Sequence, residues 1–157
     1  MKCVLLLVCV ALLVGCATVP TAVSTPSGRP EVFIPGATPE QVKPVIINRG
    51  LSKGWQLIQD TSYQVSFTHP VKNFAAIALY GSQFNGTPSA RTHFTITAVE
   101  GGTQIFYNGE MVTNPGSAFE KTYPFEDCDK NVFPEMQKAL EEIKATVLAG
   151  NPTRASH

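Results

Sequence analysis

The clearest local pattern in the chain reads RTHFTITAVE over residues 91–100, GG at 101–102 and TQIFYNGEMVT over residues 103–113. On each side of the glycine pair, apolar and polar residues alternate with a period of two, which is typical of strands with one buried face. Two glycines between two such runs indicate a tight hairpin turn. If the glycine pair forms that turn, six side chains share a face: Phe94, Ile96 and Ala98 with Ile105, Tyr107 and Met111. The stretch therefore predicts an antiparallel sheet.

Further strand patterns precede the hairpin. Trp55 and Leu57 alternate with polar residues, and so do the apolar positions from Tyr63 to Phe67. The run from Phe74 to Tyr80 is apolar almost throughout, which suits a buried strand or a helical turn, and we favour a strand. Glu31 to Pro35 reads as a short edge strand.

Two helices are expected around these strands. The first begins at Thr38, a good N-cap, with Pro39 at the first helical position and Gln41 completing a capping box, and it ends at Gly50 to Gly54. The second spans about Asn131 to Leu148 and has an apolar stripe made of Phe133, Met136, Leu140, Ile143 and Val147.

Between the hairpin and the last helix, Asn114 to Ser117 has the composition of a turn. The aromatic residues beyond it either pack over the open end of the sheet or form a contact surface, and we expect packing. They are Phe119, Tyr123 and Phe125.

The order of these elements predicts an α+β fold: an antiparallel sheet of about four to five strands with two helices packed on one face, in two layers. Residues 31–150 are expected to form one domain of the 157-residue chain, and residues 151–157 a loose tail.

The N-terminus has the features of a secretory signal. Lys2 precedes an apolar run from Val4 to Val14, which is too short to cross a bilayer as a helix. Leu13-Val14-Gly15-Cys16 resembles the lipobox of bacterial lipoproteins at all four positions. This resemblance implies that a signal peptidase recognises Leu13, Val14 and Gly15, removes residues 1–15, and leaves Cys16 carrying diacylglycerol and a further acyl chain such as palmitate.

Residues 16–30 contain three prolines among small polar residues and predict a flexible tether. Ala17, directly after the lipidated cysteine, implies by analogy with lipoproteins of diderm bacteria that the protein is sorted to the outer membrane. The expected place is the periplasmic face, with exposure at the cell surface as the alternative. The acyl chains on Cys16 make the membrane itself a partner.

The whole pattern from Glu31 to Leu148 resembles the helix-grip domains of small proteobacterial outer-membrane lipoproteins, including those of the third lipoprotein of the barrel-assembly machine. The resemblance rests on the helix ending near Gly50, the Gly54-Trp55 step into a strand, the central hairpin and the amphipathic last helix. It implies a helix-grip-like fold and a non-enzymatic envelope protein. This chain has one such domain and lacks the long unstructured N-terminal segment of that protein.

No motif for catalysis, metal binding or a cofactor is found. His69 and His93 have no partner at ligand spacing, and the acidic residues around Cys128 (Glu120, Glu126, Asp127 and Asp129) lack the pattern of a calcium loop. Cys3 and Cys9 leave with the signal, so Cys128 is unpaired and is a buried small residue, a dimer bridge or a nucleophile, in that order of expectation. The 12 basic and 12 acidic residues form no basic stripe, so nucleic acid is not an expected partner.

Three functions are compatible with these features. The first is an interaction or scaffold module with an envelope protein partner, which predicts an exposed apolar or aromatic patch. The second is a module that binds a lipid or another apolar ligand, which predicts an apolar cavity between helix and sheet. The third is a thiol- or histidine-dependent hydrolase, which predicts Cys128 within reach of His69 or His93. The sequence leaves the oligomeric state open.

Overall fold

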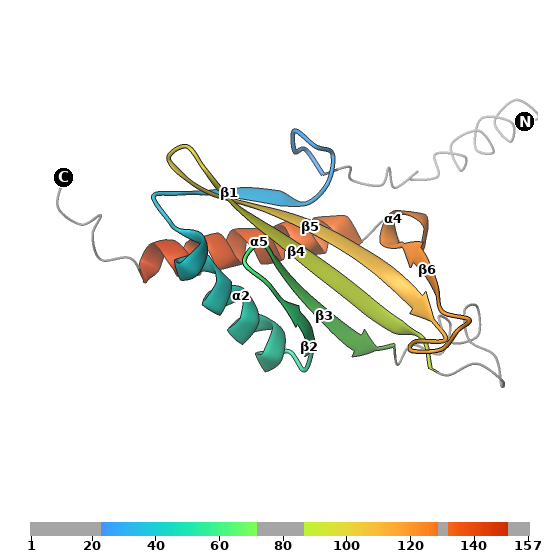
Figure 1. Ribbon diagram of the computed structural model, residues 1–157. Helices are drawn as coiled ribbons and strands as arrows, with labels where there is room; N and C mark the ends of the chain where they lie inside the picture. Colours follow the sequence, from blue (N-terminus) through green and yellow to red (C-terminus); the bar gives the residue numbers. More distant parts are fainter. Residues whose placement is uncertain (1–22, 72–86, 129–131, 151–157) are drawn as a thin grey trace, which may run out of the picture.

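The computed structural model describes residues 23–71, 87–128 and 132–150 (Figure 1). Four predicted features lie outside these ranges: the signal at residues 1–15, Cys16, the segment Phe74 to Tyr80 and the tail at residues 151–157. The described elements, in chain order, are β1 (Glu31–Pro35), α2 (Pro39–Ser52), β2 (Gln56–Asp60), β3 (Gln64–Pro70), β4 (Ser89–Val99), β5 (Gly102–Thr113), β6 (Lys121–Pro124), α4 (Phe125–Cys128) and α5 (Val132–Ala149).

The sheet is antiparallel throughout, with strand order β1-β5-β4-β3-β2. β6 also pairs with β5, along Glu110 to Thr113. It lies on the same side of β5 as β1, whose first residue, Glu31, pairs with Phe106. The α+β class with an antiparallel sheet is confirmed. The sheet has six strands, where the sequence predicts about four to five, and the additional strand is β6. All four residues of β6 are exposed, so its sequence lacks the alternation that reveals the other strands.

The central hairpin is confirmed, with its turn one residue earlier than expected. Val99 pairs with Gly102, so the loop is Glu100-Gly101, and Gly101 takes a φ of 78°. A Cβ atom at Gly102 would lie 2.3 Å from the carbonyl oxygen of Ile34, so this glycine lets β1 approach β5. The earlier turn shifts the pairing of the two strands by two residues, so that Phe94 lies opposite Tyr107. Because side chains alternate between the faces with a period of two, this even shift leaves each one on its predicted face.

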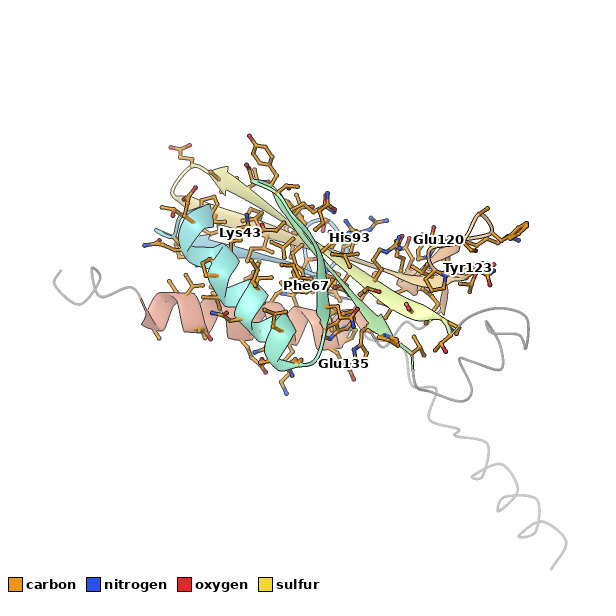
Figure 2. The ribbon with its side chains drawn as sticks, turned by 60° about the horizontal axis from the view of Figure 1, so that its bottom comes forward. Lys43, Phe67, His93, Glu120, Tyr123 and Glu135 are labelled. Atoms are coloured by element: carbon orange, nitrogen blue, oxygen red, sulfur yellow. The ribbon has the colours of Figure 1, made fainter. Side chains whose placement is uncertain are left out.

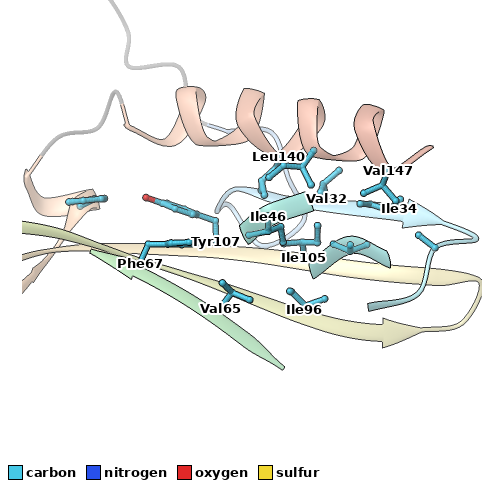
Figure 3. Close-up of a cluster of buried hydrophobic side chains, with 14 of the residues drawn as sticks. Val32, Ile34, Ile46, Val65, Phe67, Ile96, Ile105, Tyr107, Leu140 and Val147 are labelled. Atoms are coloured by element: carbon cyan, nitrogen blue, oxygen red, sulfur yellow. The ribbon is translucent and has the colours of Figure 1, made fainter. Parts of the chain in front are cut away.

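Most of the buried apolar strand residues lie on one face of the sheet, which we call the inner face. In the register, Val65 lies beside Phe94, and Ile96 and Val32 lie beside Ile105. These side chains form one hydrophobic cluster with buried residues of α2 and α5 (Figure 3). The members of the cluster from α2 and α5 are Val42, Ile46, Leu140, Ile143 and Val147.

α2 begins and ends where its sequence predicts. The Gln41 side chain accepts the backbone N–H of Thr38 at 3.0 Å, as a capping box requires. The helix continues through Gly50 and ends at Ser52, within the expected range from Gly50 to Gly54, and Gly54 with a φ of 81° follows it. A tertiary contact requires glycine at position 50, because a Cβ atom there would lie 2.6 Å from Cε1 of Phe67.

α5 has the expected apolar stripe, with Leu140, Ile143 and Val147 buried. It begins at Val132, and Asn131 lies outside the described residues. No helix in the described ranges combines the length and apolar character needed to cross a membrane.

Of the aromatic residues after the hairpin, Phe125 packs as expected, whereas Phe119 and Tyr123 are exposed. Phe125, the first residue of α4, is 7% exposed and joins the core cluster. Phe119 is 78% exposed and Tyr123 is 37% exposed. The Asn114 to Ser117 turn is confirmed by the bond from Ser117 N–H to the Asn114 carbonyl at 3.1 Å.

The chain is held against the sheet just before β1. Pro30 is buried and its carbonyl accepts the Tyr107 N–H at 3.0 Å. The Arg29 side chain donates to the Asn108 Oδ1 at 3.2 Å and pairs with Glu126 at 3.4 Å. These contacts hold Arg29 and Pro30, the last two residues of the predicted tether, against the domain.

Candidate functional site

A groove opens between α2, α5 and the inner face of the sheet, with a volume of about 280 Å³. We call it the α2–α5 groove. Its floor is formed by Phe67 of β3 and by Thr92 and Phe94 of β4, and Ile46 and Gly50 of α2 line one side. Figure 2 shows Phe67 on β3 next to α2, and Glu135 of α5 on the other side of the groove. The Phe67 and Phe94 rings meet edge to face with centroids 6.0 Å apart.

The α5 side of the groove is formed by Met136, Ala139 and Ile143. Trp55 also lines the groove; it is half-buried, and its ring centroid lies 5.3 Å from that of His69. Trp55 is the only tryptophan of the chain, so its fluorescence reports on the groove. Most of this lining is apolar, which suits a ligand with a hydrocarbon or aromatic body.

The rim of the groove is charged. It has three cationic side chains, Arg49, Lys53 and Lys138, and two carboxylates, Glu135 and Glu142. Arg49 of α2 and Glu142 of α5 form an ion pair that joins the two helices at the rim. The side chains of Lys53, Lys138 and Glu135 have no ion pair or hydrogen bond with any residue that the structure describes.

A polar network lies on the opposite, outer face of the sheet, and we call it the outer-face network. The Arg91 guanidinium pairs with Glu110 at 3.3 Å and with Glu120 at 3.1 Å. Glu120 also accepts the Gly116 N–H at 2.8 Å. The Gly116 N–H, and then Arg91, hold the pKa of the Glu120 carboxyl below its usual range.

His93 belongs to the same network. Its Nδ1 lies 2.8 Å from Ser66 Oγ, and its Nε2 lies 3.6 Å from Glu110 Oε1. The Ser66 hydroxyl, the His93 imidazole and the Glu110 carboxylate are thus arranged in the order of a Ser-His-acid catalytic triad. Ser66 has no exposed surface, however, and its Oγ also bonds to Gln59 at 3.2 Å. A substrate has no access to that hydroxyl, so the network is a structural one.

The other residues singled out from the sequence are not brought together where the structure describes their side chains. His69 Nδ1 lies 3.2 Å from the Gly54 carbonyl oxygen, and Glu126 pairs with Arg29. Cys128 is the last residue of α4, and the structure does not describe its side chain or Asp129. Among the described residues, no group of three or more His, Cys, Asp or Glu side chains could hold a metal ion. The predicted lipidation site Cys16 and the predicted peptidase-recognition residues Leu13, Val14 and Gly15 lie outside the described ranges.

Sequence reasoning gave an apolar cavity between helix and sheet as an alternative, but it did not identify the residues that line the α2–α5 groove. It placed Phe94 and Met136 on the apolar faces of their elements, whereas both are only partly buried and line the groove. Small residues on the two helices give no local signal of the groove. Ala139 lines it, but at Gly50 the Phe67 ring fills the space that a side chain would take.

Comparison with protein-family models, with curated proteins and with solved structures finds no match to this chain.

Proposed function

We propose that this protein is a lipid-anchored envelope protein whose domain binds a slender apolar ligand in the α2–α5 groove. The observation that carries the proposal is the groove itself, with aromatic side chains on its floor and apolar helix residues along its sides. Its volume of about 280 Å³ is near the lower end of ligand pockets, so it suits one chain or ring system rather than a bulky ligand.

A helix-grip-like arrangement of the helices on the sheet would support this proposal. Most of the buried apolar strand residues share the inner face, and α2 and α5 contribute to the same core cluster. We propose that both helices pack on this one face in a helix-grip-like sandwich. In such a sandwich the angle between the helices and the sheet leaves room for a ligand. The resemblance to small outer-membrane lipoproteins fits the same arrangement.

The proposed anchor would place the groove close to a membrane surface. Lipid on Cys16 would hold the domain at the outer membrane, on the periplasmic face, with exposure at the surface as the alternative. A tethered domain meets nearby acyl chains at a high effective concentration, so even modest affinity is useful there. In this proposal the protein is not an enzyme and needs no cofactor.

A second candidate function, an interaction module for an envelope protein, is favoured by a different observation. Phe33 and Phe106 lie diagonally across β1 and β5 on the outer face and are 38% and 36% exposed. Val99 of β4 is also exposed. Exposed aromatic and aliphatic side chains on an open sheet face are typical of contact surfaces.

Trp55 fluorescence tests the ligand proposal. The protein without its first 22 residues would be titrated with dodecyl maltoside and with dodecanoate, each below its critical micelle concentration. We expect a saturable change in Trp55 emission with at least one of them. Ala139→Phe, which fills the groove, should abolish this change, and Ala145→Phe, on an exposed site of the same helix, should not.

Two results would contradict the proposal. One is the absence of a saturable change with either amphiphile. The other is an unchanged titration of Ala139→Phe, which would place the binding outside the groove.

A further inference from the structure

We propose that the ligand of the α2–α5 groove is a single-chain anionic amphiphile, with its acyl chain on the apolar floor and its carboxylate or phosphate at Arg49, Lys53 and Lys138. This inference rests on the proposed function and names the ligand class for the same groove.

The first argument is the division of the groove into two chemical zones. The floor and sides are apolar, while every charged side chain that lines the groove belongs to the rim. A purely apolar ligand would leave the rim without a role, and a purely polar one would leave the floor without a partner. An amphiphile matches both zones, since its chain replaces water at the floor and its head stays at the rim.

The second argument is the balance of charges at the rim. Arg49 and Glu142 neutralise each other, which leaves Lys53 and Lys138 against Glu135 alone. An anionic head would give these two lysines the partner that they lack within the described residues. A cationic head would meet Glu135 and be repelled by both lysines. The rim therefore favours a negative charge.

The third argument is the exchangeable partner of Arg49. This guanidinium is held at the rim by Glu142, and its side chain is 27% exposed. A guanidinium binds carboxylate and phosphate through two parallel N–H donors, so a ligand head could share or replace Glu142. Removing the Glu142 charge should then free Arg49 for the ligand.

The test compares four heads on one dodecyl chain by Trp55 fluorescence: dodecanoate, dodecyl phosphate, dodecyl maltoside and dodecyltrimethylammonium. We expect both anionic amphiphiles to bind about fivefold or more tightly than the maltoside, as two exposed ion pairs allow. The cationic amphiphile should bind most weakly. The tighter of the two anions identifies a carboxylate or a phosphate as the natural head.

Variants then assign the preference to the rim. The double variant Lys53→Gln, Lys138→Gln should lose the preference for anions and keep its affinity for the maltoside. Glu142→Gln should bind dodecanoate more tightly than the wild type does. The control Lys121→Gln, Lys144→Gln removes the same charge outside the groove and should behave as the wild type does.

The outcomes separate the two proposals. If all four amphiphiles bind equally, or if the cationic one binds best, the anionic preference is wrong and the groove remains a binding site. If the control double variant loses the preference as fully as the rim variant, only the net charge matters and the inference also fails. If none of the four binds, the proposed function itself is wrong.

Discussion

Gly50 is the residue on which the shape of the groove depends most directly. It lies inside α2, where glycine costs about 1 kcal/mol relative to alanine. The contact with Phe67 offsets this cost in helix propensity, because the Phe67 ring occupies the space where a Cβ atom would lie. The groove floor and the last turn of α2 are therefore fitted to each other at this residue.

We expect Gly50→Ala to destabilise the protein. Overpacking against Phe67 costs about 1–3 kcal/mol, and the gain in helix propensity of about 1 kcal/mol offsets only part of it. Asn48→Ala, at an exposed site of the same helix, serves as the control and should be neutral or slightly stabilising. Urea denaturation measures both. A Gly50→Ala protein as stable as the Asn48→Ala protein would show that Phe67 moves freely.

Glu120 is the residue at which we expect a dependence of stability on pH. The Gly116 N–H and Arg91 stabilise its charged form, so its pKa in the folded protein lies below the unfolded value of about 4.3. The stabilisation is complete above that unfolded value and is lost as the pH falls through the lower, folded pKa.

Glu120→Gln should therefore be less stable than the wild type near neutral pH, and the difference should shrink as the pH falls below about 4. Denaturation midpoints of the two proteins from neutral to acidic pH measure this. A difference that stays constant over that range would mean that the amide loses packing or hydrogen-bond geometry rather than charge.

At the scale of elements, the two edges of the sheet are protected in different ways. At β1, the Gln137 side chain of α5 accepts the Glu31 N–H and donates to the Glu31 carbonyl, both at 3.0 Å, as a neighbouring strand would. At β2, the pairing with β3 shifts between Leu57 and Gln59, which leaves Ile58 as a bulge. A bulge and a covering side chain both discourage the addition of another strand.

We expect Gln137→Ala to lower the free energy of unfolding by about 1–3 kcal/mol, because it leaves two half-buried backbone groups of Glu31 without their partner. Lys144→Ala, also on α5, is the control and should change stability by less than about 0.5 kcal/mol. Sedimentation velocity would show whether the opened β1 edge also promotes self-association. Equal stability of the two variants would mean that water replaces the amide without cost.

The elements differ in how far their own residues define them. The capping box at Thr38 and the alternation in the hairpin are local signals, so the start of α2 and the faces of β4 and β5 were predictable. β6 was not, because its four exposed residues are held as a strand only by pairing with β5. The end of α2 lies between Gly50 and Gly54 as predicted, but the contact of Gly50 with Phe67 was not predictable, because it joins a helix to a strand.

At the scale of the whole molecule, the proposed anchor makes a direct prediction. When expressed in a diderm host, the full chain should sediment with the outer membrane and have the mass of residues 16–157 plus acyl chains. Cys16→Ala should lose this modification and be released from the membrane fraction. Its apolar run from Val4 to Val14 would stay attached, but it holds a protein in the membrane less strongly than two or more acyl chains do. Intact-mass analysis of both fractions checks it. An unmodified wild-type protein would refute the lipobox assignment.

Local sequence determined the expected anchor motif at Leu13 to Cys16, the α+β class and the inner faces of the strands, because signals of this kind depend on neighbouring residues and on periods of two or 3.6. The tertiary structure alone decided that Trp55, Phe67, Phe94 and Met136 surround a groove instead of closing a core. It also joined Arg49 to Glu142, which are 93 residues apart in the chain. The physical reason is that a cavity is the space left between elements, and its size depends on how closely they approach, which no single element encodes.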